Sequence, residues 1–191
     1  MSMHVTRRAV KCGPGPLRAG RCRGIGLLLF AATTALVGGC SSAGAAPQPA
    51  GAEPSAISKM VCTPEAQLKI TAALGSTATV SVPTWSDDLY RCVYRFPHGT
   101  LALSVKELSS RYETDAYFDS LVEQLGRSQQ LFGLGQGAFL TTDGSVVARK
   151  DWKVLLVDNS RAGASLGAGH SFSGTPAETV ASLIMTCWQG D

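Results

Sequence analysis

Ser165 and His170 are the nearest approach in this chain to a pair for nucleophilic catalysis. Ser165 is the central residue of the segment 163–167 (GASLG), which matches the G-x-S-x-G pattern of serine hydrolases. That pattern works where a strand turns sharply into a helix, and the glycine-rich residues that follow Ser165 are poor helix formers. His170 follows five positions later with no acidic residue between, so the serine, acid, histidine order is absent. The sequence therefore predicts no catalytic residue.

A glycine-rich stretch at residues 133–137 (GLGQG) is a second candidate for binding chemistry. Phosphate-binding loops use backbone N–H groups that converge at the N-terminus of a helix. This stretch contains no lysine, does not follow the G-x-G-x-x-G spacing, and leads into residues 138–141, which we expect to form a strand. We interpret it as a tight entry into that strand, with a small-ligand site as the alternative.

Metal and cofactor chemistry finds little support in the sequence. His98 and His170 have no acid or cysteine at ligand spacing, so no metal site and no cofactor are expected. Asp87 and Asp88 predict a solvated turn, because a catalytic carboxylate pair needs two separately tuned environments. We expect the three tryptophans in the core or at its edge; they are Trp85, Trp152 and Trp188.

The charge of the chain is unevenly distributed. The formal net charge is +3, but six of the 17 Lys and Arg residues lie within residues 1–39, which contain no acid. The remaining 11 basic residues stand beside 14 acidic ones, so residues 40–191 carry a formal charge of −3. Nucleic-acid binding needs clustered basic side chains, and we therefore expect no nucleic-acid partner.

The first 39 residues have the composition of an export signal. A basic segment is followed by fourteen mostly apolar residues, 24–37, which are too few for a membrane span and suit a signal peptide. Residues 36–40 (LVGGC), which overlap the end of this apolar stretch, resemble a bacterial lipobox. The resemblance implies that Cys40 carries a diacylglyceryl thioether, becomes the mature N-terminus, and anchors the protein to the cell membrane on its extracytoplasmic face.

The rest of the chain divides into a tether and a domain. Residues 41–58 are rich in Ala, Pro, Ser and Gly and have no apolar periodicity, which is typical of a flexible linker. We predict a lipoprotein signal peptide at 1–39, the lipidated cysteine and its tether at 40–58, and one globular domain at 59–191. A domain of about 130 residues can bury a single core without metals.

Three helices are expected in that domain. The first runs from Thr63 to Leu74, because Thr63 and Pro64 suit a helix start and Gly75 suits its end. The second covers residues 114–125, which carry an apolar stripe at helical spacing. The last begins at Thr175, where Thr175, Pro176 and Glu178 form a capping-box pattern.

Strands are expected between the helices. Residues 89–96 and 101–106 alternate between apolar and polar and predict an antiparallel hairpin. Residues 80–85 predict a third strand at the edge of the sheet, because Pro83 cannot donate to a ladder. Residues 138–157 predict a three-stranded meander with turns at Asp143-Gly144 and Lys150-Asp151. The expected fold is α+β, with an antiparallel sheet packed against three helices on one side. We expect the Gly/Ala/Ser-rich segment 159–174 to be a mobile loop.

Three cysteines follow Cys40 in the sequence, so at most one intramolecular disulfide can form. We favour a bond between Cys62 and Cys92, because the first helix must fold back onto the hairpin that carries Cys92. Cys187 would then be a thiol on the apolar stripe of the last helix, where we expect it to be a small buried hydrophobe. A bond between Cys62 and Cys187 is the alternative.

The order of these features resembles small actinobacterial lipoproteins with one extracytoplasmic domain of sensor-like α+β plan. The resemblance rests on Cys62 before a helix, on LYRCVY at 89–94, on GLGQGAF at 133–139, on DGSVV at 143–147 and on the final helix. Such domains are of unknown function, and the resemblance offers no catalytic residue to carry over. We expect a membrane-anchored, non-catalytic domain that binds an envelope protein or a small ligand. The alternatives are an envelope hydrolase whose serine and histidine meet in space, and a structural subunit of an envelope complex.

Overall fold

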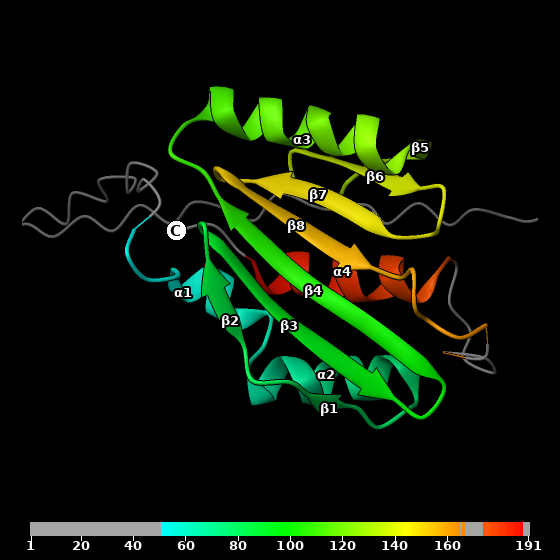
Figure 1. Ribbon diagram of the computed structural model, residues 1–191. Coiled ribbons are helices and arrows are strands. Elements are labelled where there is room, and N and C mark those ends of the chain that lie inside the picture. Colours follow the sequence, from blue (N-terminus) through cyan, green and yellow to red (C-terminus); the bar gives the residue numbers. More distant parts are fainter. Residues whose placement is uncertain (1–50, 165, 167–173, 189–191) are drawn as a thin grey trace, which may run out of the picture. The chain divides into compact units, whose positions relative to one another are not determined.

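A computed structural model describes residues 51–164, 166 and 174–188 (Figure 1). The predicted signal peptide, the lipobox with Cys40, Ser165 and His170 lie outside the described residues, as does most of the predicted tether. No helix in the described part of the chain has the length and apolar character needed to cross a membrane. The predicted α+β class is confirmed, since an antiparallel sheet packs against helices.

The helices are α1 (Ala56–Met60), α2 (Pro64–Leu74), α3 (Arg111–Leu125) and α4 (Pro176–Cys187). The strands are β1 (Thr79–Val80), β2 (Thr84–Ser86), β3 (Leu89–Phe96), β4 (Gly99–Glu107), β5 (Arg127–Leu131), β6 (Gly137–Thr141), β7 (Val146–Lys150) and β8 (Lys153–Asp158). The predicted hairpin is β3–β4, and the predicted meander is β6–β7–β8.

One sheet contains all of these strands, in the order β1-β3-β4-β8-β7-β6-β5, and β2 pairs with β3 beside β1. The hairpin and the meander join where β4 pairs with β8, with Leu103 opposite Val157 and Val105 opposite Leu155. The single edge strand expected at 80–85 is instead two short strands, β1 and β2, because Pro83 between them has no backbone N–H to donate to a ladder.

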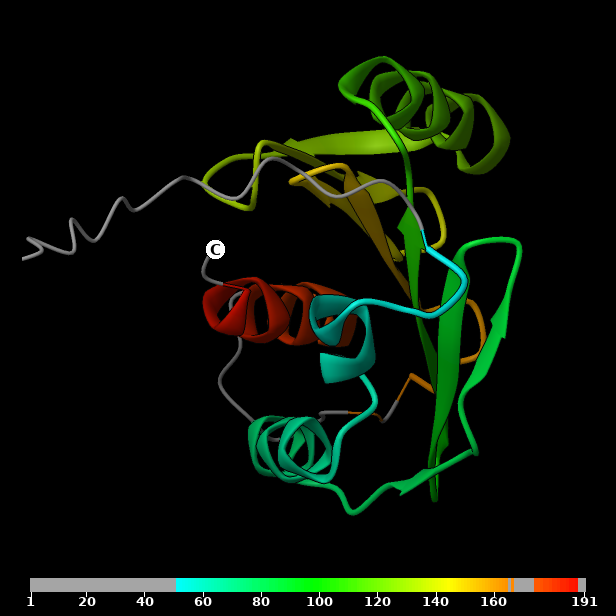
Figure 2. The same cartoon turned by 90° about the vertical axis from the view of Figure 1, so that its left-hand side faces the viewer.

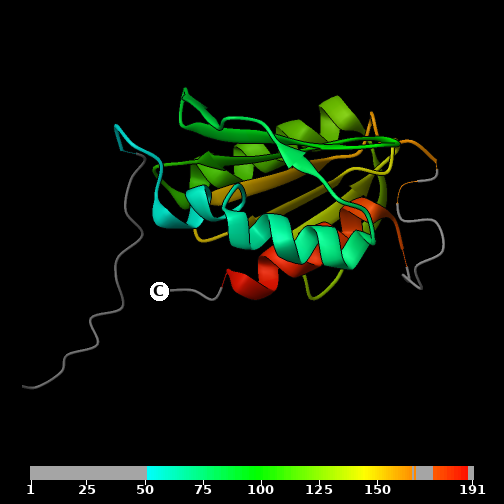
Figure 3. The ribbon, with the colours of Figure 1, turned by 90° about the horizontal axis from the view of Figure 1, so that it is seen from below.

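The helices cover both faces of the sheet, which corrects the expectation that they lie on one side. Helices α2 and α4 pack side by side on one face, while α3 lies on the other (Figures 1, 2 and 3). The reason is that β6, β7 and β8 are apolar on both faces. Val146 and Leu155 are buried in the core under α4, whereas Phe139, Val147 and Val154 form a second core with Phe118 and Leu121 of α3.

Helix α3 begins at Arg111, three residues before the predicted start. Ser110 is its N-cap and accepts a hydrogen bond from the Glu113 backbone N–H at 3.2 Å. In return, Ser109 donates its backbone N–H (2.9 Å) and its hydroxyl to the Glu113 carboxylate, and these bonds lower the pKa of Glu113. This start places the side chains of residues 111–115 on the first turn of the helix.

Helix α1 was not predicted, and it overlaps the end of the segment expected to be a tether. Its serines hold it to the sheet: the Ser55 backbone N–H (2.8 Å) and the Ser58 hydroxyl (2.5 Å) donate to the buried carboxylate of Glu107 at the end of β4. The ordered domain therefore includes residues before position 59.

The structure confirms a disulfide between Cys62 and Cys92, with Cα atoms 6.0 Å apart. Beside it, the buried Tyr94 hydroxyl donates to the Val61 carbonyl at 2.7 Å, and burial raises the pKa of Tyr94 above its ordinary value. Cys187 is a free thiol. It is half-exposed, 3.5 Å from the Lys69 ammonium, so the expectation of a buried thiol was wrong.

Two hairpins, β2–β3 and β7–β8, turn through two residues with positive φ. These are Asp87 (+51°) and Asp88 (+55°) in one turn, and Asp151 (+50°) and Trp152 (+61°) in the other. Positive φ at both positions is the signature of a type I′ turn, in which glycine and asparagine are preferred. Consecutive backbone N–H groups at the end of β4 hold both turns: Glu107 donates to the Asp88 carbonyl (2.8 Å) and Leu108 to the Trp152 carbonyl (2.9 Å).

Candidate functional site

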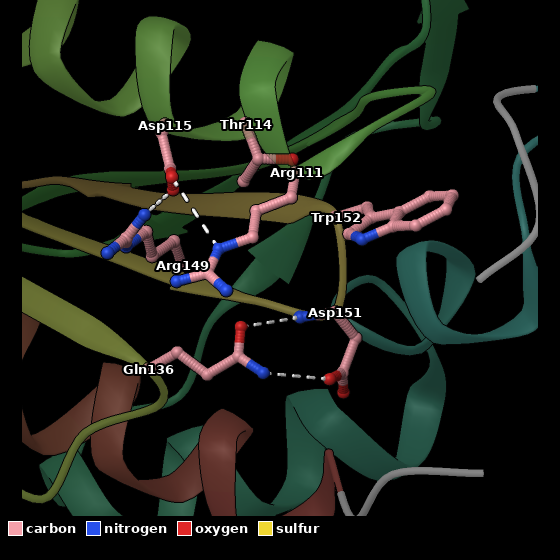
Figure 4. A pocket seen from close by; sticks show the side chains of 7 residues that line it. All are labelled: Arg111, Thr114, Asp115, Gln136, Arg149, Asp151 and Trp152. Carbon is pink, nitrogen blue, oxygen red and sulfur yellow. Dashed lines mark hydrogen bonds and ion pairs between the residues drawn. The ribbon is translucent and has the colours of Figure 1, made fainter. Parts of the chain in front are cut away.

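A pocket of about 360 Å³ lies between the first turn of α3 and the β7–β8 turn (Figure 4). Three elements and one loop supply its wall: α3, β7, the β7–β8 turn and the loop between β5 and β6. Its lining residues are Arg111, Thr114, Asp115, Gln136, Arg149, Asp151 and Trp152. We refer to this site as the Trp152 pocket.

Helix α3 contributes three of these side chains because residues at i, i+3 and i+4 share one helical face. They are Arg111, Thr114 and Asp115. Thr114 is buried, and its hydroxyl donates back to the Ser110 carbonyl at 2.8 Å. Arg111 has a side chain 85% exposed, with its Nε 3.7 Å from the Asp115 carboxylate. The early start of α3 is therefore what brings Arg111 to the pocket.

Arg149 reaches from β7 across to α3. Its guanidinium forms an ion pair with Asp115 and lies 5.2 Å from the centre of the Phe118 ring. Asp115 thus stands between two arginines, as Figure 4 shows. The Nε of Arg149 and the Oδ1 of Asp115 are both buried within this ion pair, so neither atom is open to the pocket.

The opposite wall is formed by Gln136 and Asp151. The Gln136 side chain donates to the Asp151 carboxylate and accepts from the Asp151 backbone N–H, each at 3.3 Å (Figure 4). The Gln136 backbone N–H also donates to the Arg149 carbonyl at 2.8 Å. Gly135, with φ +65°, permits this close approach, since a Cβ there would lie 2.6 Å from the Arg149 oxygen.

Trp152 closes one side of the pocket with a half-buried indole. Its backbone occupies the left-handed region, which is unfavourable for a bulky side chain. Sparsely populated backbone conformations of this kind are concentrated at functional sites. Trp152 therefore combines an unfavourable backbone conformation with a place in the lining of the pocket.

The charges of the Trp152 pocket balance. Two guanidinium groups, of Arg111 and Arg149, stand beside two carboxylates, of Asp115 and Asp151. Gln136 adds an amide that both donates and accepts. The lining therefore offers hydrogen-bond donors and acceptors in similar measure, together with one aromatic surface.

Of the candidate residues considered from the sequence, Asp87, Asp88 and His98 do not line the Trp152 pocket. Asp87 and Asp88 form a turn, as expected, and His98 lies in the β3–β4 turn. No group of three His, Cys, Asp or Glu side chains in the described ranges could hold a metal ion. The glycine-rich stretch 133–137 does lead into β6, and it also supplies Gln136 to the pocket.

The same stretch lines a second, more open hollow of about 420 Å³ beside α4. Gly133, Leu134 and Gly135 meet Lys150 and Met185 there, and Gln136 forms the wall shared with the Trp152 pocket. This hollow contains one cationic side chain and no aromatic ring among its lining residues. This hollow therefore offers a ligand fewer kinds of contact than the Trp152 pocket does.

Sequence reasoning missed Arg111, Asp115 and Arg149 and assigned Trp152 to the core or its edge. One signal for α3 was available, because Ser110 and Glu113 form a capping pair that starts the helix at Arg111.

Comparisons of this chain with models of protein families, with curated proteins and with solved structures found no match.

Proposed function

We propose that this protein is a lipid-anchored, non-catalytic binding domain of the extracytoplasmic envelope, and that its ligand is a small molecule held in the Trp152 pocket. The lipobox at 36–40 supports the anchor at Cys40, and the basic leader supports export. The Cys62–Cys92 disulfide is in keeping with an oxidising compartment.

The observation that carries the proposal is the position of Trp152. Its indole lines a concave site together with several convergent polar groups, so one pocket offers an aromatic surface and hydrogen-bonding partners at once. At the same time its backbone adopts a conformation that glycine would occupy more easily. The unfavourable backbone and the pocket lining coincide at one residue, as expected where the side chain serves binding.

The polar groups of the pocket are arranged for binding more than for catalysis. Asp115 is paired with two arginines, and Asp151 is hydrogen-bonded to Gln136. The Thr114 hydroxyl donates to its own helix. Among the described lining residues there is no histidine, cysteine or serine to act as a nucleophile or as its base. The envelope hydrolase is therefore the weaker alternative.

The test is a ligand-observed NMR screen of the domain 51–191 against a library of small neutral, acidic and basic molecules. We compare the wild type with Arg111→Ala, which removes an exposed pocket side chain, and with Arg95→Ala on β3 as the control. We expect hits that Arg111→Ala weakens at least about tenfold and Arg95→Ala leaves unchanged. Hits that both variants retain equally, or an absence of hits, would contradict the proposal.

A further inference from the structure

We infer that the ligand of the Trp152 pocket is an uncharged, hydroxyl-bearing ring, the chemistry of a saccharide. This inference rests on the proposed function and names the class of its ligand. It follows from three properties of the pocket: its balanced charge, its mixture of donors and acceptors, and its single aromatic surface.

Balanced charge disfavours an ionic ligand. An anion drawn to Arg111 or Arg149 would also face the carboxylates of Asp115 and Asp151, and a cation would face the two guanidinium groups. Either would lose hydration without gaining a net attraction. A neutral ligand avoids this loss and leaves the Asp115 ion pairs in place.

The polar lining matches hydroxyl groups. Guanidinium groups only donate, carboxylates only accept, and the Gln136 amide does both. A hydroxyl group both donates and accepts, so adjacent hydroxyls on a ring can satisfy both kinds of partner. The exposed guanidinium of Arg111 and the carboxylate of Asp151 place such a donor and such an acceptor in one pocket.

Trp152 supplies the apolar part of the site. The face of a sugar ring that carries C–H groups is apolar and flat enough to pack on an indole. The hydroxyl groups of the ring then point outward to polar side chains. The volume of about 360 Å³ lies near the lower end of the range for small-molecule sites, about 300–1,000 Å³, and suits one or two rings.

The test uses three sugars that share one pyranose ring and differ in charge: N-acetylglucosamine, glucuronate and glucosamine, the last at a mildly acidic pH that protonates its amine. Each is titrated into ¹⁵N-labelled domain while the indole N–H signals are followed. We expect N-acetylglucosamine to shift the Trp152 signal with a Kd on the order of 1 mM, as for a ligand of this size. The two charged sugars should bind at least about tenfold more weakly, and added salt should leave the neutral sugar's Kd unchanged.

Two glycine variants form a matched pair, one at the pocket and one as its control. Trp152→Gly removes the indole and installs the residue preferred in a type I′ turn, so the domain should fold and lose the binding of N-acetylglucosamine. Asp88→Gly makes the same change in the other type I′ turn, outside the pocket lining, and should leave binding unchanged.

The outcomes separate the two proposals. Equal or tighter binding of glucuronate or glucosamine overturns the neutral-ring class while the binding function stands. If none of the three sugars binds although the small-molecule screen gives hits that depend on Arg111, the saccharide class is wrong and the function stands. If that screen also fails, the pocket is not a binding site.

Discussion

At the scale of single residues, Trp152 is the most informative position in the chain. Asp88 occupies the equivalent place in the β2–β3 turn, with nearly the same φ, so the two turns form an internal comparison. The carbonyls of Asp88 and Trp152 accept from the neighbouring backbone N–H groups of Glu107 and Leu108, and the turns differ in the side chain at this position. In one turn it is a short polar group, and in the other it is an indole that lines a pocket.

We expect Trp152→Gly to leave the free energy of unfolding within about 1 kcal/mol of the wild type, because relief of the left-handed backbone offsets the lost contacts of a half-buried ring. Trp188 is 1% exposed, and Trp188→Ala should cost about 3–5 kcal/mol. Urea denaturation measures both. A loss of several kcal/mol for Trp152→Gly would mean that the indole serves packing.

Tyr94 gives a prediction for alkaline pH. Burial, and then the neighbouring Tyr90, raise the pKa of Tyr94 above its ordinary value of 10.0. A raised folded-state pKa means that the folded state favours the neutral phenol, so stability is full below about pH 10 and falls as the pH rises beyond it. Unfolding followed above pH 10 should show this loss in the wild type.

Tyr94→Phe should reduce that alkaline loss. At neutral pH it should cost about 1–2 kcal/mol, because it removes the hydrogen bond to the Val61 carbonyl. The same slope above pH 10 in both proteins would contradict the assignment of the loss to Tyr94.

At the scale of secondary-structure elements, the first turn of α3 is what assembles the pocket. Ser110 caps the helix, Arg111 and Asp115 project from its first turn, and Arg149 joins it to β7. The position of the pocket therefore depends on where α3 starts.

We expect Ser110→Ala to cost about 1 kcal/mol through loss of the N-cap and also to weaken ligand binding, because the first turn of α3 frays. Thr63→Ala removes the N-cap of α2, which does not line the pocket, and should cost a similar amount with binding unchanged. Chemical denaturation and the titration of a screening hit measure the two effects. Equal effects on binding would refute a role for α3 in positioning the site.

The elements were largely predictable, and their assembly was not. Alternation in β3 and β4 and the caps of α2 and α4 are local signals, and each of these elements formed as expected. Strand β5 (RSQQL) has no alternation of apolar and polar residues, so its place at the sheet edge depends on pairing with β6. The short α1 depends on contacts of Ser55 and Ser58 with Glu107, about fifty residues away.

The pocket could not be predicted for the same reason. Arg111, Gln136, Arg149 and Trp152 are separated in sequence and meet only because α3 lies over β7 on the face opposite α4. The stripe at Phe118 predicted a packed helix, but nothing local indicated which face of the sheet it would cover. The positive φ of Trp152 could not be predicted from the sequence either, because a tryptophan is an unusual residue for a type I′ turn.

At the scale of the whole molecule, the proposal is a binding domain held near a membrane by a short tether. Eleven residues lie between Cys40 and Ala52, whose carbonyl accepts from the Trp85 indole, and a flexible coil of that length would span roughly 18 Å. The ligand is then expected to be a component of the envelope close to that membrane. Anchoring and binding are separable claims and need separate tests.

Anchoring is tested by Cys40→Ser in the full-length chain, expressed in a bacterium that processes lipoproteins. We expect the variant to be unprocessed or released, and the wild-type membrane form to show a lipid adduct on Cys40 by intact mass. Cys22→Ser, within the leader, should be lipidated normally. A Cys40→Ser protein without its leader that stayed in the membrane would refute the anchor.

The binding claim is tested most directly by one spectrum of the ¹⁵N-labelled domain, recorded with and without the pooled hits of the small-molecule screen. The chain has three tryptophans in different surroundings: Trp152 in the pocket, Trp85 on β2, and the buried Trp188 after α4. The signal missing from Trp152→Gly assigns the pocket indole. A ligand in the Trp152 pocket shifts that indole N–H and leaves the other two in place. A shift of the Trp85 or Trp188 indole signal, with the Trp152 signal unmoved, would contradict binding in the Trp152 pocket.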